Sequence, residues 1–294
     1  MILSVENMAI RSRLGDKRIF DYYRLAGLTG MDFDLCQMKD WDEVVGSPRY
    51  LEIADEIREY AKLQGVAISQ SHAPFEVKYG MEFDRSCKKY DDVVRAMEFA
   101  SRLGAPMIVV HSIRLPEDDL QAHFDYNLKY YRSLLPYAER FGIKMAVENL
   151  GGRAPGTNDF TQFCLGSPEM FCGMQEALNS PMVCGCLDIG HANLTTGDAP
   201  GFIRKSRGYV QYLHVHDNDG RYDMHQMPAL NEDGYRWTKV PWKEVLSALR
   251  DIDYSGPMNL EVYRFIDAMP DEHLLEVMKL AASVARTMAL ELEK

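Results

Sequence analysis

The stretch Cys184-Gly-Cys-Leu-Asp-Ile-Gly-His-Ala-Asn-Leu194 is an apolar run that ends in Asp188 and carries His191 three residues later. A carboxylate at the end of a strand, with an imidazole just beyond it, can hold a divalent cation from one side. Four further apolar runs end in the same kind of residue, at His111, Glu148, His214 and Glu261. Five such runs in one chain predict a shared site where the ends of several strands meet.

The spacing of the apolar runs predicts the fold class. Strands are expected to start near residues 2, 30, 66, 106, 143, 183, 210 and 257, with helical patterns between them. Near-continuous apolar strands are typical of a parallel sheet buried on both faces, and eight of them can close into a barrel. Because no linker or break in composition divides residues 1–294, we expect one domain, an α/β fold that forms a single (β/α)8 TIM barrel. A doubly wound open sheet is the alternative, but it does not explain polar residues at the ends of so many strands.

Helix boundaries are predicted from capping residues and glycines. The pairs Ser47-Pro48 and Ser167-Pro168 are typical of helix starts, where serine caps the first turn and proline fits its first position. Gly104 and Gly142 follow apolar stripes at helical spacing and are expected to end their helices. The predicted helices include residues 16–26, 84–103, 117–141 and 242–250, and one from about 271. His123 and His273 fall within helices and are expected at the surface.

The composition is typical of a soluble globular protein. Of 294 residues, 46% are hydrophobic and 26% are charged, and the formal net charge is −11. This charge argues against binding to nucleic acid or to anionic lipid. No window holds the ~20 apolar residues that span a bilayer, and residues 1–6 are too short for a signal sequence, so we expect a cytoplasmic protein. The six cysteines show no CxxC spacing, which favours reduced thiols.

Four carboxylates and five imidazoles follow the predicted strands and are candidate metal ligands: His72, His111, Glu148, Asp188, His191, His214, Asp223, His225 and Glu261. Mixed nitrogen and oxygen donors suit Zn²⁺ or Mn²⁺ better than Ca²⁺ or Mg²⁺, which favour oxygen ligands. A carboxylate deep in an apolar run is almost never fully buried unless it is paired, which favours a functional role for Glu148 and Glu261.

Single residues of this set have simpler interpretations. A histidine on an apolar strand is more often a hydrogen-bonded core residue than a ligand, and Asp223 and His225 lie in a polar segment that an ordinary solvated loop would also show. His214 and His216 are two residues apart on one strand, so both can face the barrel interior and the spacing leaves open which one is the ligand. Asp217 should point away from them.

The strand-end motifs resemble those of the xylose isomerase-like TIM-barrel superfamily. They run in order from the third to the eighth predicted strand: Ser71-His-Ala-Pro-Phe75, Val110-His111-Ser112, Val147-Glu-Asn-Leu150, Leu187-Asp-Ile-Gly-His191, His214-Val-His-Asp-Asn218 with Asp223-Met-His225, and Leu260-Glu-Val262. That superfamily contains sugar isomerases and epimerases, related dehydratases, and endonuclease IV-type enzymes that cut DNA at abasic sites. The motifs are specific for the superfamily and much less specific for a reaction.

The resemblance implies a different metal centre in each branch. In the isomerase and epimerase branch it implies one metal, held by Glu148, Asp188, His214 and Glu261. It also implies that Glu148 and Glu261 move substrate protons and that His191 contacts a substrate oxygen. In the endonuclease branch it implies three zinc ions, which use the same positions together with His72, His111, His191, Asp223 and His225. All nine positions are filled in this chain.

Two departures favour the sugar branch. Residues 226–234 replace a glycine-rich segment typical of the family, and Leu150-Gly-Gly-Arg153 is more like the isomerases than the nucleases. We therefore predict an isomerase or epimerase that uses Zn²⁺ or Mn²⁺ and moves protons through a metal-stabilised enediolate of a sugar, sugar phosphate or cyclitol. The predicted substrate-binding residues are Phe75, Asn149, Arg153 and His191. The alternatives are a phosphodiesterase acting on abasic DNA, a dehydratase, and a barrel that binds a metal and a sugar-like ligand without turnover. A homodimer is a family-level expectation.

Overall fold

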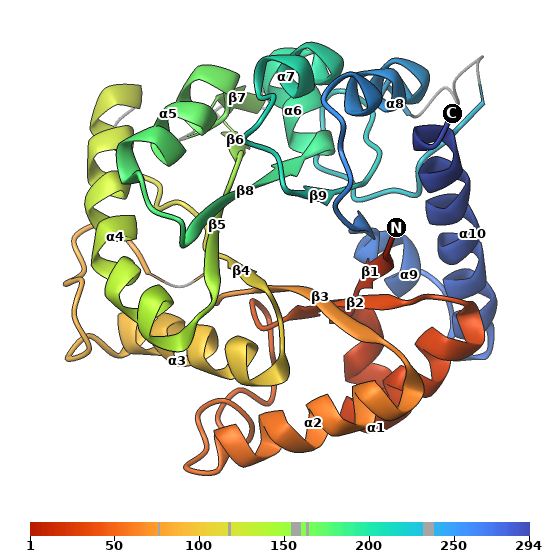
Figure 1. Cartoon of the computed structure of the whole chain (residues 1–294), viewed down its shortest axis with the longest axis horizontal. Helices are drawn as coiled ribbons and strands as arrows, with labels where there is room; N and C mark the ends of the chain where they lie inside the picture. Colours follow the sequence, from red (N-terminus) through yellow and green to blue (C-terminus); the bar gives the residue numbers. More distant parts are fainter. Residues whose placement is uncertain (76, 117–118, 154–159, 163–164, 232–237) are drawn as a thin grey trace.

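The computed structural model describes residues 1–75, 77–116, 119–153, 160–162, 165–231 and 238–294. Eight parallel strands form a nearly closed barrel (Figure 1): β1 (Leu3–Glu6), β2 (Gly30–Asp34), β3 (Ala67–His72), β4 (Met107–Val109), β5 (Lys144–Glu148), β8 (Val183–Asp188), β9 (Tyr212–His214) and β10 (Met258–Leu260). They pair in the order β10-β1-β2-β3-β4-β5-β8-β9, and a bridge between Val215 and Leu260 joins the two edges. The predicted (β/α)8 barrel is confirmed in place of the open sheet.

Helices connect successive strands and bury their apolar faces against the outside of the barrel (Figure 1). They are α1 (Met8–Ala26), α2 (Tyr50–Gln64), α3 (Lys88–Leu103), α4 (Leu120–Phe141), α5 (Pro168–Leu178), α6 (Ile189–Thr196), α7 (Ala199–Lys205), α8 (Trp242–Asp251), α9 (Tyr263–Asp267) and α10 (Leu274–Leu292). A short antiparallel pair, β6 (Gly151–Arg153) and β7 (Phe160–Gln162), follows β5. Among the described helices, none is long and apolar enough to cross a membrane.

The capping signals identified some helix boundaries correctly. The side chain of Ser167 accepts a hydrogen bond from the backbone N of Met170 and caps α5, as predicted. Gly104 and Gly142 adopt φ angles of 94° and 65° and end α3 and α4, because only glycine reaches this region without strain. Ser47 does not cap α2. Its hydroxyl accepts a hydrogen bond from the backbone N of Arg49 at 3.1 Å within a turn, and the helix starts at Tyr50.

Other helix starts differ from the prediction. The first helix begins at Met8 rather than near residue 16, and Gly15 interrupts it with non-helical angles of φ 71° and ψ 177°. The third begins at Lys88 rather than near 84. His273 is exposed as predicted, but the prediction for His123 is wrong: its side chain is buried on the same face of α4 as Asn127, one turn further along.

The interior of the barrel is apolar on one side and polar on the other. Beneath the ends of β4, β5 and β8 lies an apolar layer formed by Met107, Val109, Ala146, Cys184 and Cys186. These two cysteines are free thiols on one face of β8, as predicted. On the side of β1 and β3, the hydroxyls of Ser4 and Ser69 are hydrogen-bonded at 2.7 Å. The barrel therefore carries an internal polar region that leads toward the strand ends.

A register shift between β2 and β3 orients this polar region. Met31 pairs with Ile68, but the next residue, Asp32, pairs with Gln70, so Ser69 is an extra residue in β3. A bulge of this kind changes the direction of the residues that follow it. Gln70 and His72 consequently share the inner face with Asp32, which accepts hydrogen bonds from the Gln70 amide at 2.8 Å and from the Asn259 amide at 3.0 Å.

Candidate active site

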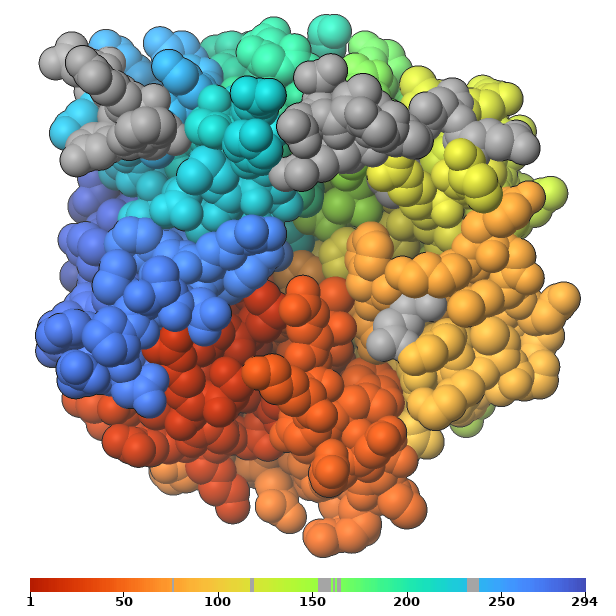
Figure 2. All heavy atoms as spheres, turned by 180° about the vertical axis from the view of Figure 1, so that it is seen from behind, coloured from red at the N-terminus to blue at the C-terminus, as the bar shows by residue number. Residues whose placement is uncertain are grey.

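The nine predicted ligands meet at the carboxyl ends of the strands. Most of them line a cavity of about 480 Å³, whereas Asp188 and His214 are fully buried beside it. Figure 2 shows this face of the molecule, which has a central recess. The N-terminal segment and the segment near residue 260 lie on one side of the recess, and the segments near residues 150 and 220 lie on the other. Residues far apart in the sequence therefore form one site, because parallel strands bring their carboxyl ends to the same edge.

Glu148 and His214 form the centre of the site. The Nδ1 atom of His214 lies 2.7 Å from Glu148 Oε1 and 3.8 Å from Glu261 Oε2. Burial alone would raise the pKa of Glu148, but the charge of His214 and its hydrogen bond lower that pKa to about 2. His111 Nε2 lies 3.4 Å from the second carboxylate oxygen of Glu148. Glu148 is therefore held as a carboxylate.

The pKa of Glu261 is shifted in the opposite direction. Burial raises its pKa well above the usual value, and the charges of Asp188 and Glu148 raise it further. One oxygen of Glu261 lies 3.6 Å from His72 Nε2, and the other lies 3.5 Å from His225 Nδ1. Two glutamates of one cavity therefore have pKa values shifted in opposite directions.

Asp188 is positioned by its neighbours along the chain and across the sheet. Its carboxylate caps α6 by accepting a hydrogen bond from the backbone N of His191 at 2.6 Å. The amide of Asn149 donates to the Asp188 carbonyl at 2.9 Å and accepts from the Asp188 backbone N at 2.7 Å. Asn149 is fully buried, and its side chain is committed to Asp188. Both ends of the Asn149 side-chain amide are thus hydrogen-bonded to the Asp188 backbone, and its predicted contact with a substrate stays a prediction.

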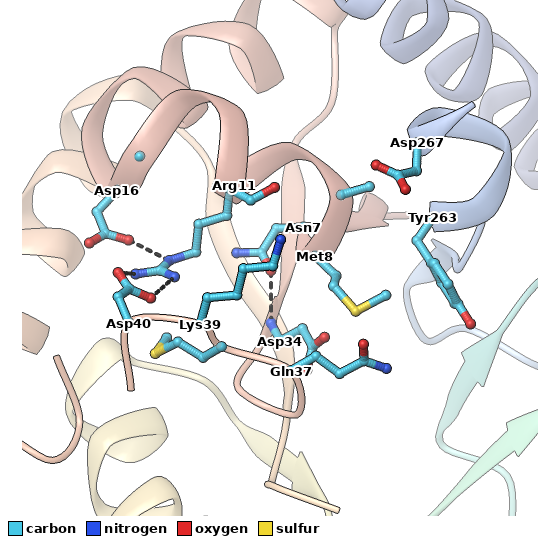
Figure 3. A pocket seen from close by; sticks show the side chains of 14 residues that line it. Asn7, Met8, Arg11, Asp16, Asp34, Gln37, Lys39, Asp40, Tyr263 and Asp267 are labelled. Atoms are coloured by element: carbon cyan, nitrogen blue, oxygen red, sulfur yellow. Dashed lines mark hydrogen bonds and ion pairs between the residues drawn. The ribbon is translucent and has the colours of Figure 1, made fainter. Parts of the chain in front are cut away.

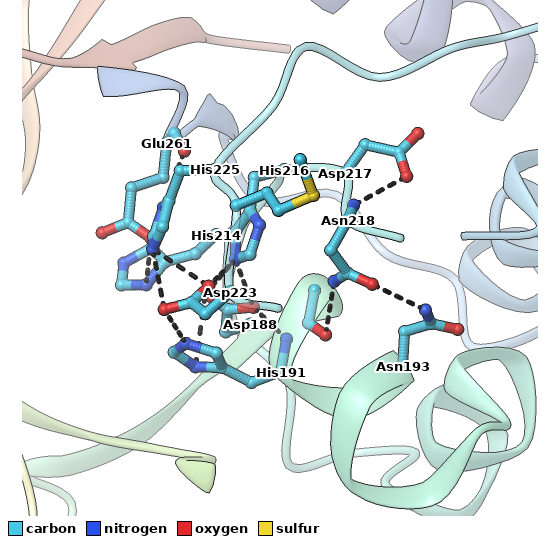
Figure 4. A network of polar contacts seen from close by, with 12 residues as sticks. Asp188, His191, Asn193, His214, His216, Asp217, Asn218, Asp223, His225 and Glu261 are labelled. Atoms are coloured by element: carbon cyan, nitrogen blue, oxygen red, sulfur yellow. Dashed lines mark hydrogen bonds and ion pairs between the residues drawn. The ribbon is translucent and has the colours of Figure 1, made fainter. Parts of the chain in front are cut away.

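Both histidines of β9 and its extension face the interior (Figure 4). His214 groups with Glu148 and Asp188, whereas His216 groups with residues of the following loop and places Nε2 3.1 Å from the Asp188 carboxylate. Gly190 makes room for His216, because a Cβ at Gly190 would lie 2.1 Å from its ring. Asp217 points away as predicted and accepts a hydrogen bond from Trp242 Nε1 at 2.6 Å.

The loop that carries Asp223 and His225 is closed by backbone hydrogen bonds between Asp217 and Gln226 in both directions. His225 Nε2 lies 3.2 Å from the Asp223 carboxylate, and its ring stacks on His216 with 4.1 Å between centroids. His225 has a φ of 46°, which is uncommon for a residue other than glycine and is found preferentially at functional sites. The loop is therefore an ordered part of the site.

The first two strands add three carboxylates that the sequence interpretation did not select. Asp32 is fully buried, and its carboxylate lies 3.0 Å from His72 Nδ1. Burial alone would lower the pKa of His72, but the negative charge of Asp32 and its hydrogen bond raise that pKa to about 10. Glu6 and Asp34 line the cavity, and burial raises the pKa of both. The strand Gly30–Asp34 alternates apolar residues with carboxylates, and that alternation was the signal for Asp32 and Asp34.

The remaining predicted substrate contacts lie toward the rim. Phe75 is 44% exposed and its ring meets the edge of His111 with 4.6 Å between centroids. His191 lines the cavity, with Nδ1 3.1 Å from the Asn149 carbonyl. Arg153 belongs to β6, but its side chain lies outside the described part of the chain. Phe75 and His191 are thus in positions from which they can contact a ligand.

The donor atoms fit a divalent cation. Several buried polar atoms of the site have no hydrogen-bond partner: His72 Nε2, His111 Nδ1, Glu148 Oε2, His214 Nε2, His216 Nδ1 and Asp223 Oδ1. Such atoms are rare in proteins unless another ligand satisfies them. Four groups of described residues have ligand atoms within 4.8 Å of one another: Glu148 with Asp188 and His214; His191 with His216, Asp223 and His225; Asp32 with His72 and His214; and Asp188 with His216 and Glu261. The mixture of nitrogen and oxygen donors suits Zn²⁺ or Mn²⁺.

Comparison with known proteins places this site in a family context. An uncharacterized protein of Methanocaldococcus jannaschii is 26% identical over 238 residues, which cover 78% of this chain and 75% of that protein. A D-psicose 3-epimerase of Enterocloster bolteae is 23% identical over 223 residues, or 71% of this chain and 65% of the epimerase. The crystal structure of the IolI protein with a bound zinc atom has the same fold, with a TM-score of 0.69 at 16% identity over 99% of this chain and 98% of the other.

Most of the chain matches the profile of a protein family. The profile described as xylose isomerase-like TIM barrel matches residues 20–282. This range includes all nine predicted ligands and the strands from β2 to β10. The chain therefore belongs to the xylose isomerase-like TIM barrel family.

Proposed function

We propose that this protein is a sugar isomerase or epimerase that depends on a divalent metal. The observation that carries the proposal is the placement of Glu148 and Glu261, two glutamates that line one cavity beside His214, whose Nδ1 lies 2.7 Å from Glu148 Oε1 and 3.8 Å from Glu261 Oε2. A proton transfer between two positions needs one group that accepts a proton and a second that donates one, and two carboxyl groups with pKa shifts of opposite direction suit that need. The similarity to a D-psicose 3-epimerase supports the proposal.

Glu148, Asp188, His214 and Glu261 would hold the metal. The two carboxylates and the imidazole of the first three already lie within 4.8 Å of one another, and Glu261 Oε2 lies 3.8 Å from His214 Nδ1. A bound divalent cation polarises the carbonyl and hydroxyl oxygens of a sugar and offsets the negative charge that develops when a neighbouring carbon loses its proton. Zn²⁺ and Mn²⁺ are the candidates that the donor atoms favour.

The protein's own groups move the proton. Glu148, with its lowered pKa, removes the proton from the carbon beside the carbonyl, and Oε2 is the oxygen that has no hydrogen-bond partner. Glu261, with its raised pKa, returns a proton. Return to the opposite face of the same carbon is epimerisation, and return to the adjacent carbon is isomerisation. Loss of a β-hydroxyl after the first step would instead give a dehydratase.

Metal analysis combined with solvent exchange tests this proposal. The metal content per chain is measured, and the Zn²⁺- or Mn²⁺-loaded protein is incubated in D₂O with ketoses, ketose phosphates and inosose-like cyclitols. We expect deuterium to enter the carbon beside the carbonyl of at least one of these compounds. A metal-loaded protein that binds such a sugar but never exchanges its proton would be a binding protein, and the proposed reaction would be wrong.

A second candidate is a multi-zinc phosphodiesterase that acts on abasic DNA. It is favoured by the second donor group, His191, His216, Asp223 and His225, and by the proximity of His72 and His111 to the glutamates. The net charge of −11 weighs against a DNA substrate. This candidate predicts two or three zinc ions per chain and cleavage of an abasic duplex after EDTA treatment and zinc restoration. Deuterium exchange into a sugar without such cleavage would reject it.

A further inference from the structure

A second pocket of about 500 Å³ adjoins the cavity of the candidate active site. It lies between the first turns of α1, the loop after β2 and the start of α9 (Figure 3). Met8, Asp34, Gln37 and Tyr263 line both the pocket and the cavity. The two spaces are therefore neighbouring compartments of one cleft on the face where the strands end.

The combined space exceeds what one small sugar needs. Sites for small molecules measure roughly 300 to 1,000 Å³ and enclose most of their ligand. The cavity of about 480 Å³ already accommodates a monosaccharide, and the adjoining pocket of about 500 Å³ doubles the available volume. The cleft thus fits a ligand with two units of similar size, one in each compartment.

The charges in the second pocket favour an uncharged unit. Arg11 is already neutralised, because its Nε lies 2.6 Å from Asp16 and its two terminal nitrogens lie 2.7 and 2.8 Å from the carboxylate of Asp40. Asp267 is neutralised in the same way, because Arg13 Nη2 lies 3.0 Å from its carboxylate. Among the described residues that line the pocket, Lys39 is the only other cation, and it is exposed. A phosphate group would thus find no buried, unpaired cation among these residues, whereas hydroxyl groups can donate to the carboxylates.

The junction between the two compartments has a pair of buried carboxyl groups. Glu6 lines the active-site cavity, is only 2% exposed, and accepts a hydrogen bond from the backbone N of Met8 at 3.1 Å. Its side chain also interacts with Asp34, which lines both compartments, so the two carboxyl groups together offer several oxygens to the hydroxyl groups of a ligand. Tyr263 offers an aromatic ring at the same junction, and aromatic rings pack against the apolar faces of sugars.

We propose that the substrate extends from the metal centre into the second pocket and is a ketose joined to a second, uncharged sugar. The reacting ketose occupies the cavity beside Glu148 and Glu261, and the second sugar occupies the pocket beside Lys39 and Gln37. The inference rests on the proposed function, whose substrate class it narrows.

The test compares short and extended ketoses in the metal-loaded protein. Deuterium exchange is measured with D-fructose, D-fructose 6-phosphate, and the ketose disaccharides isomaltulose and lactulose. We expect kcat/KM to be at least about ten-fold higher for one of the disaccharides than for D-fructose, a factor that corresponds to about 1.4 kcal/mol. The effect should appear mainly in KM, because the second sugar lies away from the reacting carbon.

A variant that fills the second pocket tests whether the two compartments bind different parts of the substrate. Ser12 lines the pocket but not the cavity, so Ser12→Phe should lower kcat/KM for the disaccharide about ten-fold and leave D-fructose within about two-fold. Lys17→Phe, an exposed substitution on the same helix outside the pocket, is the matched control and should change neither. Unchanged D-fructose turnover also shows that Ser12→Phe is folded.

Three outcomes would overturn the inference. The first is that the disaccharides react no faster than D-fructose. The second is that Ser12→Phe lowers kcat/KM equally for the disaccharide and for D-fructose. A strong preference for D-fructose 6-phosphate that is lost in Arg264→Gln would place the distal group in the neighbouring pocket that Arg264 lines instead. If no ketose exchanges deuterium, the proposed function fails, but a thermal-shift measurement still tests the extended binding site. Isomaltulose should raise the melting temperature of the wild type and not that of Ser12→Phe. If isomaltulose stabilises neither protein, the inference is wrong.

Discussion

Two parts of the barrel mouth use buried carboxylates in opposite ways. In the histidine half, formed by the ends of β5, β8 and β9 and the loop to His225, Glu148 and Asp188 have imidazole partners that lower their pKa values despite burial. In the carboxyl half, formed by the ends of β1 and β2, burial raises the pKa values of Glu6 and Asp34. The comparison shows that the partner of a buried carboxylate, rather than its burial alone, decides its charge.

This difference assigns different tasks to the two halves. Negative carboxylates with imidazole neighbours suit a metal ion and the transfer of a proton. Carboxyl groups that burial keeps closer to neutrality suit the hydroxyl groups of a sugar, because they can both donate and accept hydrogen bonds. Substitutions of single carboxylates, or of residues packed against them, test whether the two halves differ in this way.

The largest effect is expected for Glu148→Gln in the histidine half. The amide has nearly the shape of the carboxylate but cannot accept the substrate proton, so deuterium exchange should fall by about 10²- to 10⁴-fold while the circular dichroism spectrum is unchanged. Glu139→Gln, an exposed substitution on α4, is the control and should keep full activity. If Glu148→Gln still incorporated deuterium into a substrate that turns over, Glu148 would not be the proton carrier.

The metal content of the protein should differ between variants of the two halves. Asp188→Asn removes a negative donor from the group with Glu148 and His214, and metal affinity should fall by about 10- to 100-fold or more. Asp34→Asn in the carboxyl half should retain the metal of the wild type. Elemental analysis after dialysis against a fixed concentration of free Zn²⁺ measures both. Equal metal loss in the two variants would show that the halves do not differ in this respect.

Gly190→Ala tests the packing of the histidine half without removing a polar group. The added Cβ would overlap the ring of His216, which must then move away from the Asp188 carboxylate. Displacements of about 1 Å in an active site can lower the rate by about 100-fold, so we expect a loss of that order in kcat/KM. Gly173→Ala is the control, because its Cβ would make only an ordinary contact at 3.8 Å with Phe124.

The smallest effect is expected in the carboxyl half, for Glu6→Gln. The folded-state pKa of Glu6 is raised above its unfolded value, so its contribution to stability is present below about pH 4.3 and is lost as the pH rises toward the folded-state pKa. The glutamine variant does not titrate. Its melting temperature relative to the wild type should therefore increase by a few degrees as the pH rises above about 4.3. A difference that stays flat with pH would contradict the raised pKa of Glu6.

The sequence was most informative where the signal was local. Apolar runs that end in polar residues predicted the barrel and the positions of Glu148, Asp188 and Glu261, because both features follow from strand order alone. Asp32 was not selected, since its partners Gln70 and Asn259 lie 38 and 227 residues away and only the closed barrel brings them together. The burial of His123 was missed for a related reason: an apolar stripe does not show how much of a helix its neighbours cover.

The structural role of Asn149 was also beyond the sequence. Its position after Glu148 suggested a substrate contact, but the register between β5 and β8 puts it beside the Asp188 backbone, where its amide has two partners. A motif indicates which side chain is present and not which hydrogen bonds it makes.

The extra residue in β3 has a consequence for how this scaffold tolerates changes in chain length. Alternate residues of a strand face opposite sides, but the bulge absorbs Ser69, so Gln70 and His72 still lie opposite Asp32 and Asp34 and face the interior. Deletion of Ser69 would place Gln70 directly after Ile68 and would keep the same two side chains on the inner face. A change of one residue in the length of β3 can therefore leave this wall of the mouth in place.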